Sequence, residues 1–334
     1  MSRQKFPVTQ NPLVTYIVVA YNQEQLVREA VQSAFAQNYT PLEIILSDDC
    51  SSDRTFDIMQ ELALNYEGRH SVKVVQNSEN LGLFDHIICR GKQASGEIAI
   101  LAAGDDISVP ERTTKTVEAF NEGTGAAFSL VSIINGKGTV LADAVERPLH
   151  LRRPKLPLLP RNNSYDVIQG CSAAYRRWVF DIPVSSRGKR YPEDLIFSFY
   201  LHLLGSTVRR VDLPLVGYRA HADALTNIPE DCAQVVDEER RCRVAVGSLQ
   251  LLSDYRAIAD VLGKWDMVDF KIVRQREVCL RDILDWPGLP FRKRLWRTFT
   301  MGAGFGWVPF RWKLVRLWGR YPNYQPRKFI SSMK

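Results

Sequence analysis

Four short apolar runs, each rich in β-branched residues, alternate with segments of helical periodicity in the first third of the chain. They are typical of buried strands and occupy Val14 to Ala20, Leu42 to Ser47, Val72 to Gln76 and Ile98 to Ala102. No hairpin signal separates one run from the next. Strands that alternate with helices in this way predict βα units, and therefore the α/β fold class with a mostly parallel sheet flanked by helices.

Polar pairs follow three of these runs: Tyr21-Asn22, Asp48-Asp49 and Asp105-Asp106. In parallel sheets, ligands bind outside the carboxyl ends of the strands, so these pairs predict a nucleotide-binding crevice. The segment after the first run, A-Y-N-Q-E-Q, contains no G-x-G-x-x-G, and the chain has no G-x-x-x-x-G-K-[ST] loop. A metal ion and side chains would then have to hold a diphosphate.

Asp105 and Asp106 stand between an apolar run and Pro110, which is expected to open a helix. Carboxylates suit a divalent cation such as Mg²⁺, which is usually held by one or two of them together with substrate phosphates. The alternative is a turn that caps the next helix, a common use of Asp. By themselves the residues leave both interpretations open.

The order and spacing of several sequence blocks resemble family 2 glycosyltransferases with the GT-A fold. The blocks are V-V-A-Y-N-Q-E, E-I-I-L-S-D-D-C-S-S-D, N-L-G, A-S-G-E and L-A-A-G-D-D-I-S-V-P-E-R. The resemblance spans residues 14–112 and continues more weakly to about residue 227. It implies an inverting transferase that takes a sugar from a nucleoside-diphosphate donor, with UDP-sugars favoured.

The resemblance also implies roles for residues at these strand ends. Asp105 would meet the ribose or the metal, Asp106 would bind the metal directly, and Asp49 would contact the base. The nucleoside pocket would be lined by Val19, Ala20 and Tyr21. Cys50 departs from the family pattern, because many members have Gly at this position.

Glu193 and Asp194 follow Pro192 at the start of a strongly apolar helix. Acids in a first turn stabilise a helix through its dipole, by a few tenths to about 1 kcal/mol, which is one interpretation. The other is catalytic, because inverting transfer needs one carboxylate to accept the proton of the acceptor hydroxyl and needs no enzyme nucleophile. The Glu-Asp motif of the family lies at this point, so we expect Asp194 to be the general base and Glu193 to orient it or the acceptor.

His221 follows Tyr218-Arg219 in a polar stretch, as a histidine does in some family relatives. It would complete the site for a divalent cation, Mn²⁺ or Mg²⁺, or touch the diphosphate. The alternative is a solvated loop histidine. Residues 146–163 are rich in Pro and Arg and are expected to form a loop over the acceptor side.

The basic residues are unevenly distributed. From Trp286 to Lys334 there are eleven Lys or Arg, no acid and five of the seven tryptophans, whereas the preceding residues include 33 basic and 37 acidic side chains. Such a segment is typical of a helix in the interface of an anionic membrane. It could also dock on the domain itself. Nucleic-acid binding is not expected, because no nucleic-acid motif accompanies it.

These features predict three parts: a GT-A catalytic domain at 1–228, a helical extension at 229–285, and a membrane-associating tail at 286–334. The first ten residues lack the apolar core of a signal peptide, no run of 18 apolar residues occurs, and the six cysteines include no C-x-x-C pair. We therefore expect a cytoplasmic protein that associates peripherally with the inner face of the cell membrane.

The function expected from residues and resemblance together is transfer of a sugar to a glycan or polyprenyl-linked acceptor in surface-polysaccharide synthesis. One alternative is a sugar-nucleotide nucleotidyltransferase, although these enzymes usually carry a Gly-rich triphosphate loop after the first strand, which this sequence lacks. The other is a non-catalytic membrane-associated scaffold with the same fold, which retention of the three acidic pairs disfavours.

Overall fold

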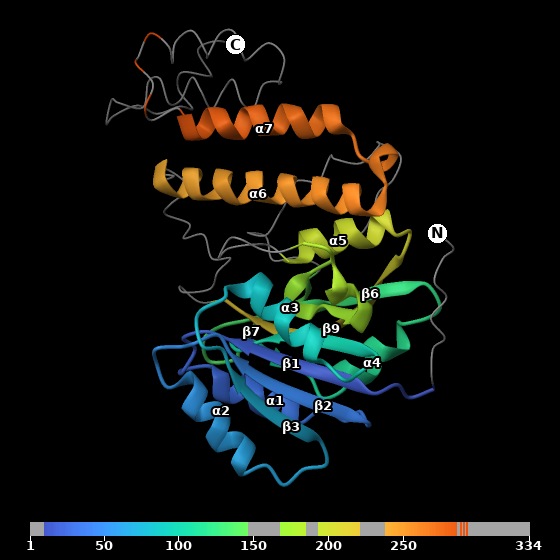
Figure 1. Cartoon of the computed structure of the whole chain (residues 1–334). Coiled ribbons are helices and arrows are strands. Elements are labelled where there is room, and N and C mark those ends of the chain that lie inside the picture. The colour runs from blue at the N-terminus through green and yellow to red at the C-terminus, as the bar shows by residue number, and fades with distance from the viewer. Residues whose placement is uncertain are drawn as a thin grey trace. The chain divides into compact units, whose positions relative to one another are not determined.

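The structure is a computed structural model, and it describes residues 10–145, 168–184, 193–220 and 238–285, together with residues 288, 290 and 292 (Figure 1). Two compact units divide the chain. The first comprises Met1–Val235 and Ser253–Val268, and the second comprises Val236–Leu252 and Asp269–Lys334. All described residues of the candidate site belong to the first unit.

The first half of this unit alternates strands with helices as predicted. Its elements are β1 (Val14–Ala20), α1 (Val27–Phe35), β2 (Leu42–Asp48), α2 (Thr55–Leu64), β3 (Ser71–Gln76), α3 (Leu83–Gln93) and β4 (Ile98–Ala103). The four strands lie in the order β3-β2-β1-β4, and all three pairings are parallel. Their carboxyl ends therefore meet at one edge, as the polar pairs require.

The second half of the unit mixes strand directions. Its elements are β5 (Ile107–Ser108), α4 (Arg112–Glu118), β6 (Thr124–Ile134), β7 (Val140–Val145), η2 (Gly170–Ser172), β8 (Ala174–Arg176), η3 (Arg177–Asp181), α5 (Glu193–Leu203) and β9 (Thr207–Arg219). β8 pairs antiparallel with β4 and with β6, and β9 pairs parallel with β6. The fold class is confirmed as α/β, with a sheet that is parallel in its first half and mixed beyond it.

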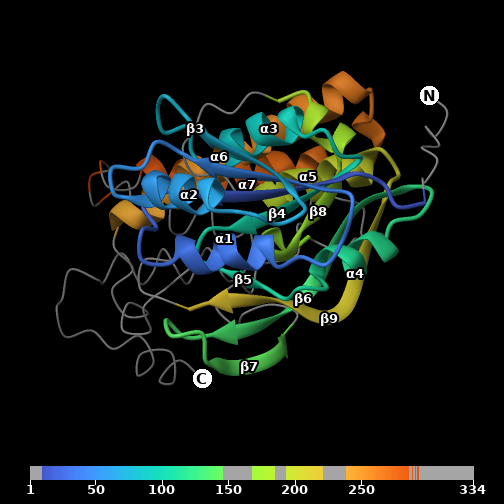
Figure 2. The same cartoon turned by 90° about the horizontal axis from the view of Figure 1, so that it is seen from below.

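Helices cover both faces of the parallel strands, and Figure 2 shows α1 and α3 on opposite sides of them. On one face Tyr16 and Val18 of β1 pack with Val31 of α1 in a single buried cluster that also includes Met59 of α2. On the other face Phe84 of α3 lies with its ring centroid 6.0 Å from that of Phe197 in α5, and the rings of Phe180 and Phe197 are 5.7 Å apart. Strands buried on both faces explain the continuous apolar runs of the sequence.

Residues 207–219 pair with β6 along their whole length despite an internal proline. They form one strand, β9, whose pairing with β6 shifts register where Leu130 lies opposite Pro214. Pro214 has no N–H to donate, and an irregularity of this kind lets a strand continue past a proline. β7 was not predicted, because its residues alternate weakly and its side chains are largely exposed.

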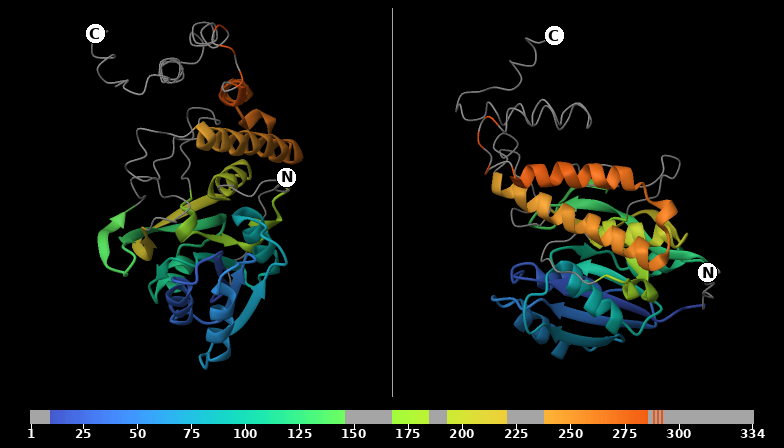
Figure 3. Two further views of the ribbon diagram at one scale, coloured as in Figure 1. Left: turned by 90° about the vertical axis from the view of Figure 1, so that its left-hand side faces the viewer. Right: turned by 45° about the horizontal axis from the view of Figure 1, so that its top comes forward.

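Residues 238–285 are helical, as the periodicity predicts. They form α6 (Glu238–Leu262), the short η5 (Trp265–Met267) and α7 (Phe270–Asp285). α6 is one long helix (Figure 3), and its two ends are assigned to different units. No helix in the described part of the chain is long and apolar enough to span a bilayer. The Trp-rich tail lies outside the described residues, apart from isolated positions.

Candidate functional site

The loops that follow β1 and β2 are joined by reciprocal hydrogen bonds. The main-chain N–H of Asn22 donates to Ser51 Oγ at 2.8 Å, and the N–H of Glu24 donates to Asp53 Oδ2 at 3.0 Å. In the other direction, Arg54 N–H donates to Glu24 Oε2 at 3.1 Å. Asn22 has a φ of 52°, a conformation that Asn tolerates better than most residues. The two loops therefore form one rim at the carboxyl edge of the sheet.

Asp49 lies at the base of this rim, with its side chain buried. Oδ1 accepts from Leu81 N–H at 2.9 Å and from Asn77 Nδ2 at 2.7 Å, and Oδ2 accepts from Gly82 N–H at 2.9 Å. The residue is 2% exposed. A carboxylate has about four acceptor positions, so these bonds leave one on Oδ2. Asp49 thus joins β2 to the turn that opens α3.

The residues predicted for the nucleoside pocket stand beside this carboxylate. Ala20 C=O accepts from Asp49 N–H at 2.9 Å, and Val19 C=O accepts from Gly104 N–H at 2.9 Å. A Cβ on Gly104 would lie only 2.6 Å from Ala20 Cβ, so only glycine permits this approach. Tyr21 is 48% exposed at the strand end. Its position suits a side chain that faces a ligand.

Asp106 is almost fully buried next to the half-buried Asp105. Its Oδ1 accepts the main-chain N–H of Arg219 at 2.9 Å. Burial and the charge of Asp105 raise the pKa of Asp106 well above its ordinary value, while Arg219 and Arg112 oppose this shift. The Asp106 carboxylate thus bonds β9 and does not cap α4, whose N-cap residue is Glu111. A buried acid held in this way is costly to ionise without a nearby cation.

The donor set of this acid pair fits a divalent cation. Two adjacent carboxylates supply the oxygen ligands that Mg²⁺ and Mn²⁺ prefer. A bound cation would also offset the charge repulsion between Asp105 and Asp106. Within the described ranges, no group of three or more His, Cys, Asp or Glu side chains gathers as metal ligands. The remaining ligands would therefore come from a diphosphate, from water or from residues outside those ranges.

Cys171, in η2, links this acid pair to the Glu193-Asp194 motif. Burial raises the pKa of the Cys171 thiol, and the charges of Asp106 and Asp194 raise it further. Gln169 and Arg112 oppose this shift. The main-chain oxygen of Cys171 accepts from Arg112 Nη2 at 3.5 Å, so η2 packs against an arginine whose charge also acts on Asp106.

Gly170 sets the distance between η2 and the start of α5. A Cβ on Gly170 would lie 2.1 Å from Glu193 Oε1 and 3.7 Å from Asp194 Cβ. The main-chain N–H of Leu195 donates to Asp194 Oδ1 at 2.8 Å. Asp194 therefore bonds the first turn of α5 and lies close to Gly170, the residue before Cys171.

His221 and the predicted acceptor loop, residues 146–163, lie outside the described residues. Sequence reasoning missed Gly170, Cys171 and the buried Tyr175. Burial, together with the charges of Glu193 and Asp194, raises the pKa of Tyr175. The proximity of these residues to the acids depends on the antiparallel placement of β8 beside β4, which the local sequence pattern does not reveal.

The sequence model of Glycosyl transferase family 2 matches residues 15–181. These residues contain the rim, the Asp48-Asp49 and Asp105-Asp106 pairs, and η2. The chain belongs to this family. The predicted resemblance to this family is therefore confirmed.

Among curated relatives, the chain is similar to the putative glycosyltransferase EpsE of Bacillus subtilis, with 35% identity over 106 residues, which are 32% of this chain and 37% of EpsE. It is also similar to WfaP of Escherichia coli, a UDP-Glc:alpha-D-GlcNAc-diphosphoundecaprenol beta-1,3-glucosyltransferase. That match has 24% identity and covers 64% of this chain and 80% of WfaP. The chain spans little more than a third of the length of the first of these relatives.

Two solved structures share the fold. Staphylococcus aureus TarS 1-349, crystallised with UDP-GlcNAc, has a TM-score of 0.51 and 19% identity, covering 93% of each chain. The mannosyltransferase PcManGT of Pyrobaculum calidifontis, in complex with GDP-Man and Mn²⁺, has a TM-score of 0.51 and 17% identity, covering 98% of this chain and 85% of that one. These likenesses confirm the predicted GT-A-type fold.

Proposed function

We propose that this chain is an inverting, metal-dependent glycosyltransferase that moves a sugar from a nucleoside-diphosphate donor, a UDP-sugar in the first instance, to a hydroxyl of its acceptor. The observation that carries the proposal is the position of η2: a Cβ on Gly170 would lie 3.7 Å from Asp194 Cβ, and the adjacent Cys171 C=O accepts from Nη2 of Arg112, whose charge opposes the pKa shift of Asp106. Inverting transfer needs one acid beside the diphosphate and another beside the incoming hydroxyl. The family assignment and the names of WfaP and TarS support it.

On the donor side, the base and ribose would lie at the rim formed by the β1 and β2 loops. Tyr21 would cover the base, and Val19 and Ala20 would form the pocket floor. The remaining acceptor position on Asp49 Oδ2 would receive an N–H of the base. Asp105, Asp106 and His221 would hold the cation, which when bound stabilises the negative charge of the leaving diphosphate.

On the acceptor side, Asp194 would accept the hydroxyl proton as the oxygen bonds to the anomeric carbon and the bond from that carbon to the diphosphate oxygen breaks. Glu193, held against Gly170, would orient the acceptor. The proton ends on the Asp194 carboxylate and the electron pair on the diphosphate. No covalent sugar–enzyme intermediate is required, in keeping with inversion.

A screen of ligand-induced thermal stabilisation would test the donor. Nucleoside diphosphates and sugar nucleotides are compared with and without Mn²⁺, and we expect stabilisation by one base only and only with the metal. Asp194→Asn should keep this stabilisation and lower turnover by about 10²- to 10⁴-fold. Undiminished turnover in Asp194→Asn would remove Asp194 as the base, and stabilisation by none of the nucleotides would count against the transferase itself.

The acceptor would be a glycan or a polyprenyl-linked oligosaccharide of surface-polysaccharide synthesis, used at the inner face of the cell membrane. The name of WfaP, with its diphosphoundecaprenol acceptor, supports this choice, as does the cationic, Trp-rich composition of residues 286–334. Truncation after Asp285 should release the protein from anionic liposomes in a flotation gradient. Retention of the truncated chain on those liposomes would overturn this part.

Of the two alternatives, neither gains support from the site. A nucleotidyltransferase needs a loop for a triphosphate after β1, whereas the loop after β1 is bonded to the β2 loop through Asn22 and Glu24. A non-catalytic scaffold would not lose function in Asp194→Asn. Turnover in wild type and in Asp194→Asn therefore separates the transferase from the scaffold.

A further inference from the structure

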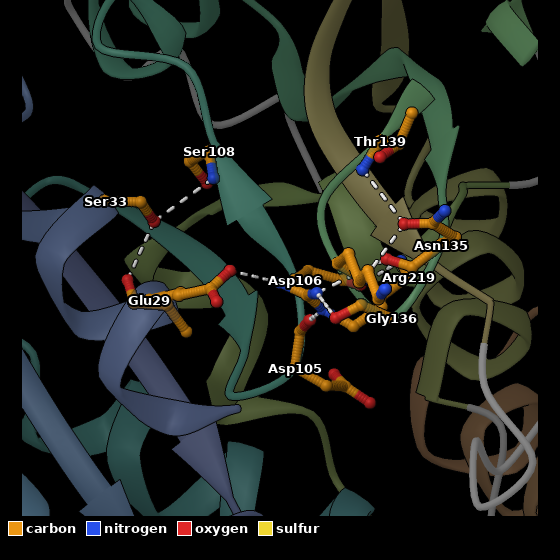
Figure 4. Close-up of polar contacts among 11 residues, drawn as sticks. Glu29, Ser33, Asp105, Asp106, Ser108, Asn135, Gly136, Thr139 and Arg219 are labelled. Atoms are coloured by element: carbon orange, nitrogen blue, oxygen red, sulfur yellow. Dashed lines mark hydrogen bonds and ion pairs between the residues drawn. The ribbon is translucent and has the colours of Figure 1, made fainter. Parts of the chain in front are cut away.

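Arg219, the last residue of β9, is fully buried and joins three separate parts of the domain (Figure 4). Its Nε donates to the main-chain oxygen of Asp105 at 2.8 Å, and its Nη1 donates to that of Gly136 at 2.7 Å. Its Nη2 donates to Glu29 Oε2 at 2.6 Å. Its own main-chain N–H donates to Asp106 Oδ1. One residue thus holds both members of the acid pair.

We propose that Arg219 is a positioning residue for the reaction. It fixes the loop of Gly104, Asp105 and Asp106 against α1 and the β6–β7 turn, and Glu29 balances its charge so that the guanidinium does not compete with a bound cation. This inference rests on the proposed function, because the proposed function is what assigns cation binding to Asp105 and Asp106. It adds two residues, Arg219 and Glu29, that touch neither donor nor acceptor.

The geometry requires arginine and not merely a positive charge. The guanidinium is a rigid, planar fork with five N–H donors, and here its nitrogens bond acceptors on α1, the acid loop and the β6–β7 turn at once. A lysine ammonium is a single point on a flexible chain, so it cannot span the three acceptors. A lysine at position 219 would therefore keep the charge and lose the bracing.

The turn that receives Nη1 is itself fixed. Asn135 Oδ1 accepts from Lys137 N–H at 2.9 Å and from Thr139 N–H at 3.0 Å, which closes the turn around Gly136. On the other side, Glu29 belongs to the first turn of α1. Arg219 therefore ties the acid loop to α1 and to the β6–β7 turn, and each of these has hydrogen bonds of its own.

The placement of charges favours a bracing role over neutralisation. The guanidinium bonds Asp105 through its neutral carbonyl oxygen, and the bond to Asp106 comes from the main chain. The ion pair is made with Glu29, whose side chain is 49% exposed. Without Glu29, a buried positive charge would stand beside the acid pair and weaken cation binding there.

The chain offers a matched control in Arg176 and Glu97. Arg176 is also buried, its Nη1 lies 3.6 Å from Glu97 Oε2, and this glutamate is 40% exposed. The guanidinium lies over the ring of Phe120 and not beside the acid pair. Substitutions here disturb a buried arginine of the same kind without touching the loop.

Amide hydrogen exchange over residues 103–108 tests the bracing in the free protein, with no substrate needed. Arg219→Lys should raise exchange in this segment at least about tenfold, and Arg176→Lys should leave it unchanged. Should Arg219→Lys fail to fold, Glu29→Ala carries the same test, because Glu29 lies at the surface. Equal protection of the segment in wild type and in the Arg219 or Glu29 variant would overturn the proposal.

Kinetics test the consequence for transfer. Arg219→Lys should lower kcat on the order of 10²-fold, the cost of a displacement near 1 Å, with the acceptor KM unchanged. Glu29→Gln should raise the apparent KM for Mn²⁺ by about fivefold and keep kcat at saturating metal, while Glu97→Gln changes neither value. An equal fall in kcat for Arg219→Lys and Arg176→Lys would reduce Arg219 to a structural role and overturn the proposal.

The two experiments also separate this inference from the proposed function. If no nucleotide binds wild type and yet exchange in the Arg219 variant rises, Arg219 still braces the acid loop, but the transferase assignment fails and with it the role of Arg219 in positioning the acid pair for transfer. If donors bind and are turned over while the Arg219 variants match wild type, only the inference fails.

Discussion

The acid pairs that end β2 and β4 look alike in the sequence but have different surroundings in the fold. Asp48 accepts from Ser51 N–H at 2.9 Å and Gln76 Nε2 at 3.0 Å, and the carboxylate of Asp49 accepts three hydrogen bonds. Asp106 is equally buried, yet burial and Asp105 raise its pKa. The β2 pair is held by hydrogen bonds within the loops, whereas the β4 pair keeps a carboxyl whose pKa is raised, which is the pair that we propose binds the cation. An acid pair at a strand end therefore identifies a site only together with its hydrogen-bond partners.

Matched amides should reveal this contrast most strongly. Asp106→Asn should weaken Mn²⁺-dependent donor binding by at least about 10²-fold, since changing even a hydrogen-bond partner of a metal ligand costs roughly 10- to 100-fold. Asp49→Asn places an NH₂ against main-chain donors and should destabilise the fold by about 2–3 kcal/mol. Calorimetry for binding and urea unfolding for stability measure the two effects.

The same pair of variants should show stability changes of opposite sign. A carboxyl whose pKa is higher in the folded state than in the unfolded state loses stability as the pH rises through that range, so ionised Asp106 is a cost at neutral pH. Removing the ionisable carboxyl in Asp106→Asn should therefore stabilise the metal-free protein at neutral pH. Destabilisation by both amides would erase the distinction between the two acid pairs.

Acid pH should act on the β2 region through His86. Burial lowers the pKa of His86 to about 4, below its ordinary 6.5, and its Nε2 lies 2.5 Å from Ser47 Oγ. The unfolded chain therefore binds this proton first, and stability should fall by about 3 kcal/mol as the pH decreases from 6.5 to 4. Unfolding at several pH values should show this slope in wild type. The free energy of unfolding of His86→Gln should not show this dependence on pH. An equal dependence in wild type and in the variant would mean that another group causes it.

Gly170→Ala tests the region where the second acid motif meets the first. The added methyl would meet Glu193 Oε1, the flexible end of a side chain, so stability should change little while that carboxylate moves. If Glu193 orients the acceptor, kcat/KM for the acceptor should fall about tenfold, equal to about 1.4 kcal/mol, with donor binding preserved. Unaltered acceptor kinetics would show that the position of Glu193 is irrelevant to transfer.

The smallest effect is expected at Cys50, in the rim. Its φ is 61°, in the left-handed region that favours glycine, which is the residue many family members have there. Cys50→Gly should stabilise the fold by a few tenths of a kcal/mol to about 1 kcal/mol, because relief of about 1–2 kcal/mol of steric cost exceeds the entropic cost of glycine. Cys50→Val should destabilise it. Thermal unfolding of the two variants provides the comparison.

The parallel half of the fold was predictable because local pattern determines it. β1 has the predicted bounds, and β2 and β4 each extend one residue further. α1 begins only at Val27, because the residues before it bond the β2 loop. The mixed half depends on long-range pairing of β6, β8 and β9, about which short windows carry no information.

The site was predictable in its residue types but not in their surroundings. The paired acids stand out in the sequence, whereas the closeness of Gly170 to Glu193 and Asp194 depends on long-range packing. Two of the hydrogen bonds that hold Asp49 come from a turn about thirty residues away. The brace by Arg219 spans from residue 29 to residue 219. Contacts at such separations leave no periodic signal in the chain.

The hydrogen bonds that join Asn22 to Ser51 and Glu24 to Asp53 make the two rim loops one structural unit. We therefore expect the sequences of the two loops to change together, in evolution and in design. A residue inserted into one loop would move its main-chain N–H groups away from the side chains that accept from them in the other loop. The fold would tolerate such an insertion only with a compensating change in the other loop. Redesign of the nucleotide preference should therefore exchange both loops together, as one cassette.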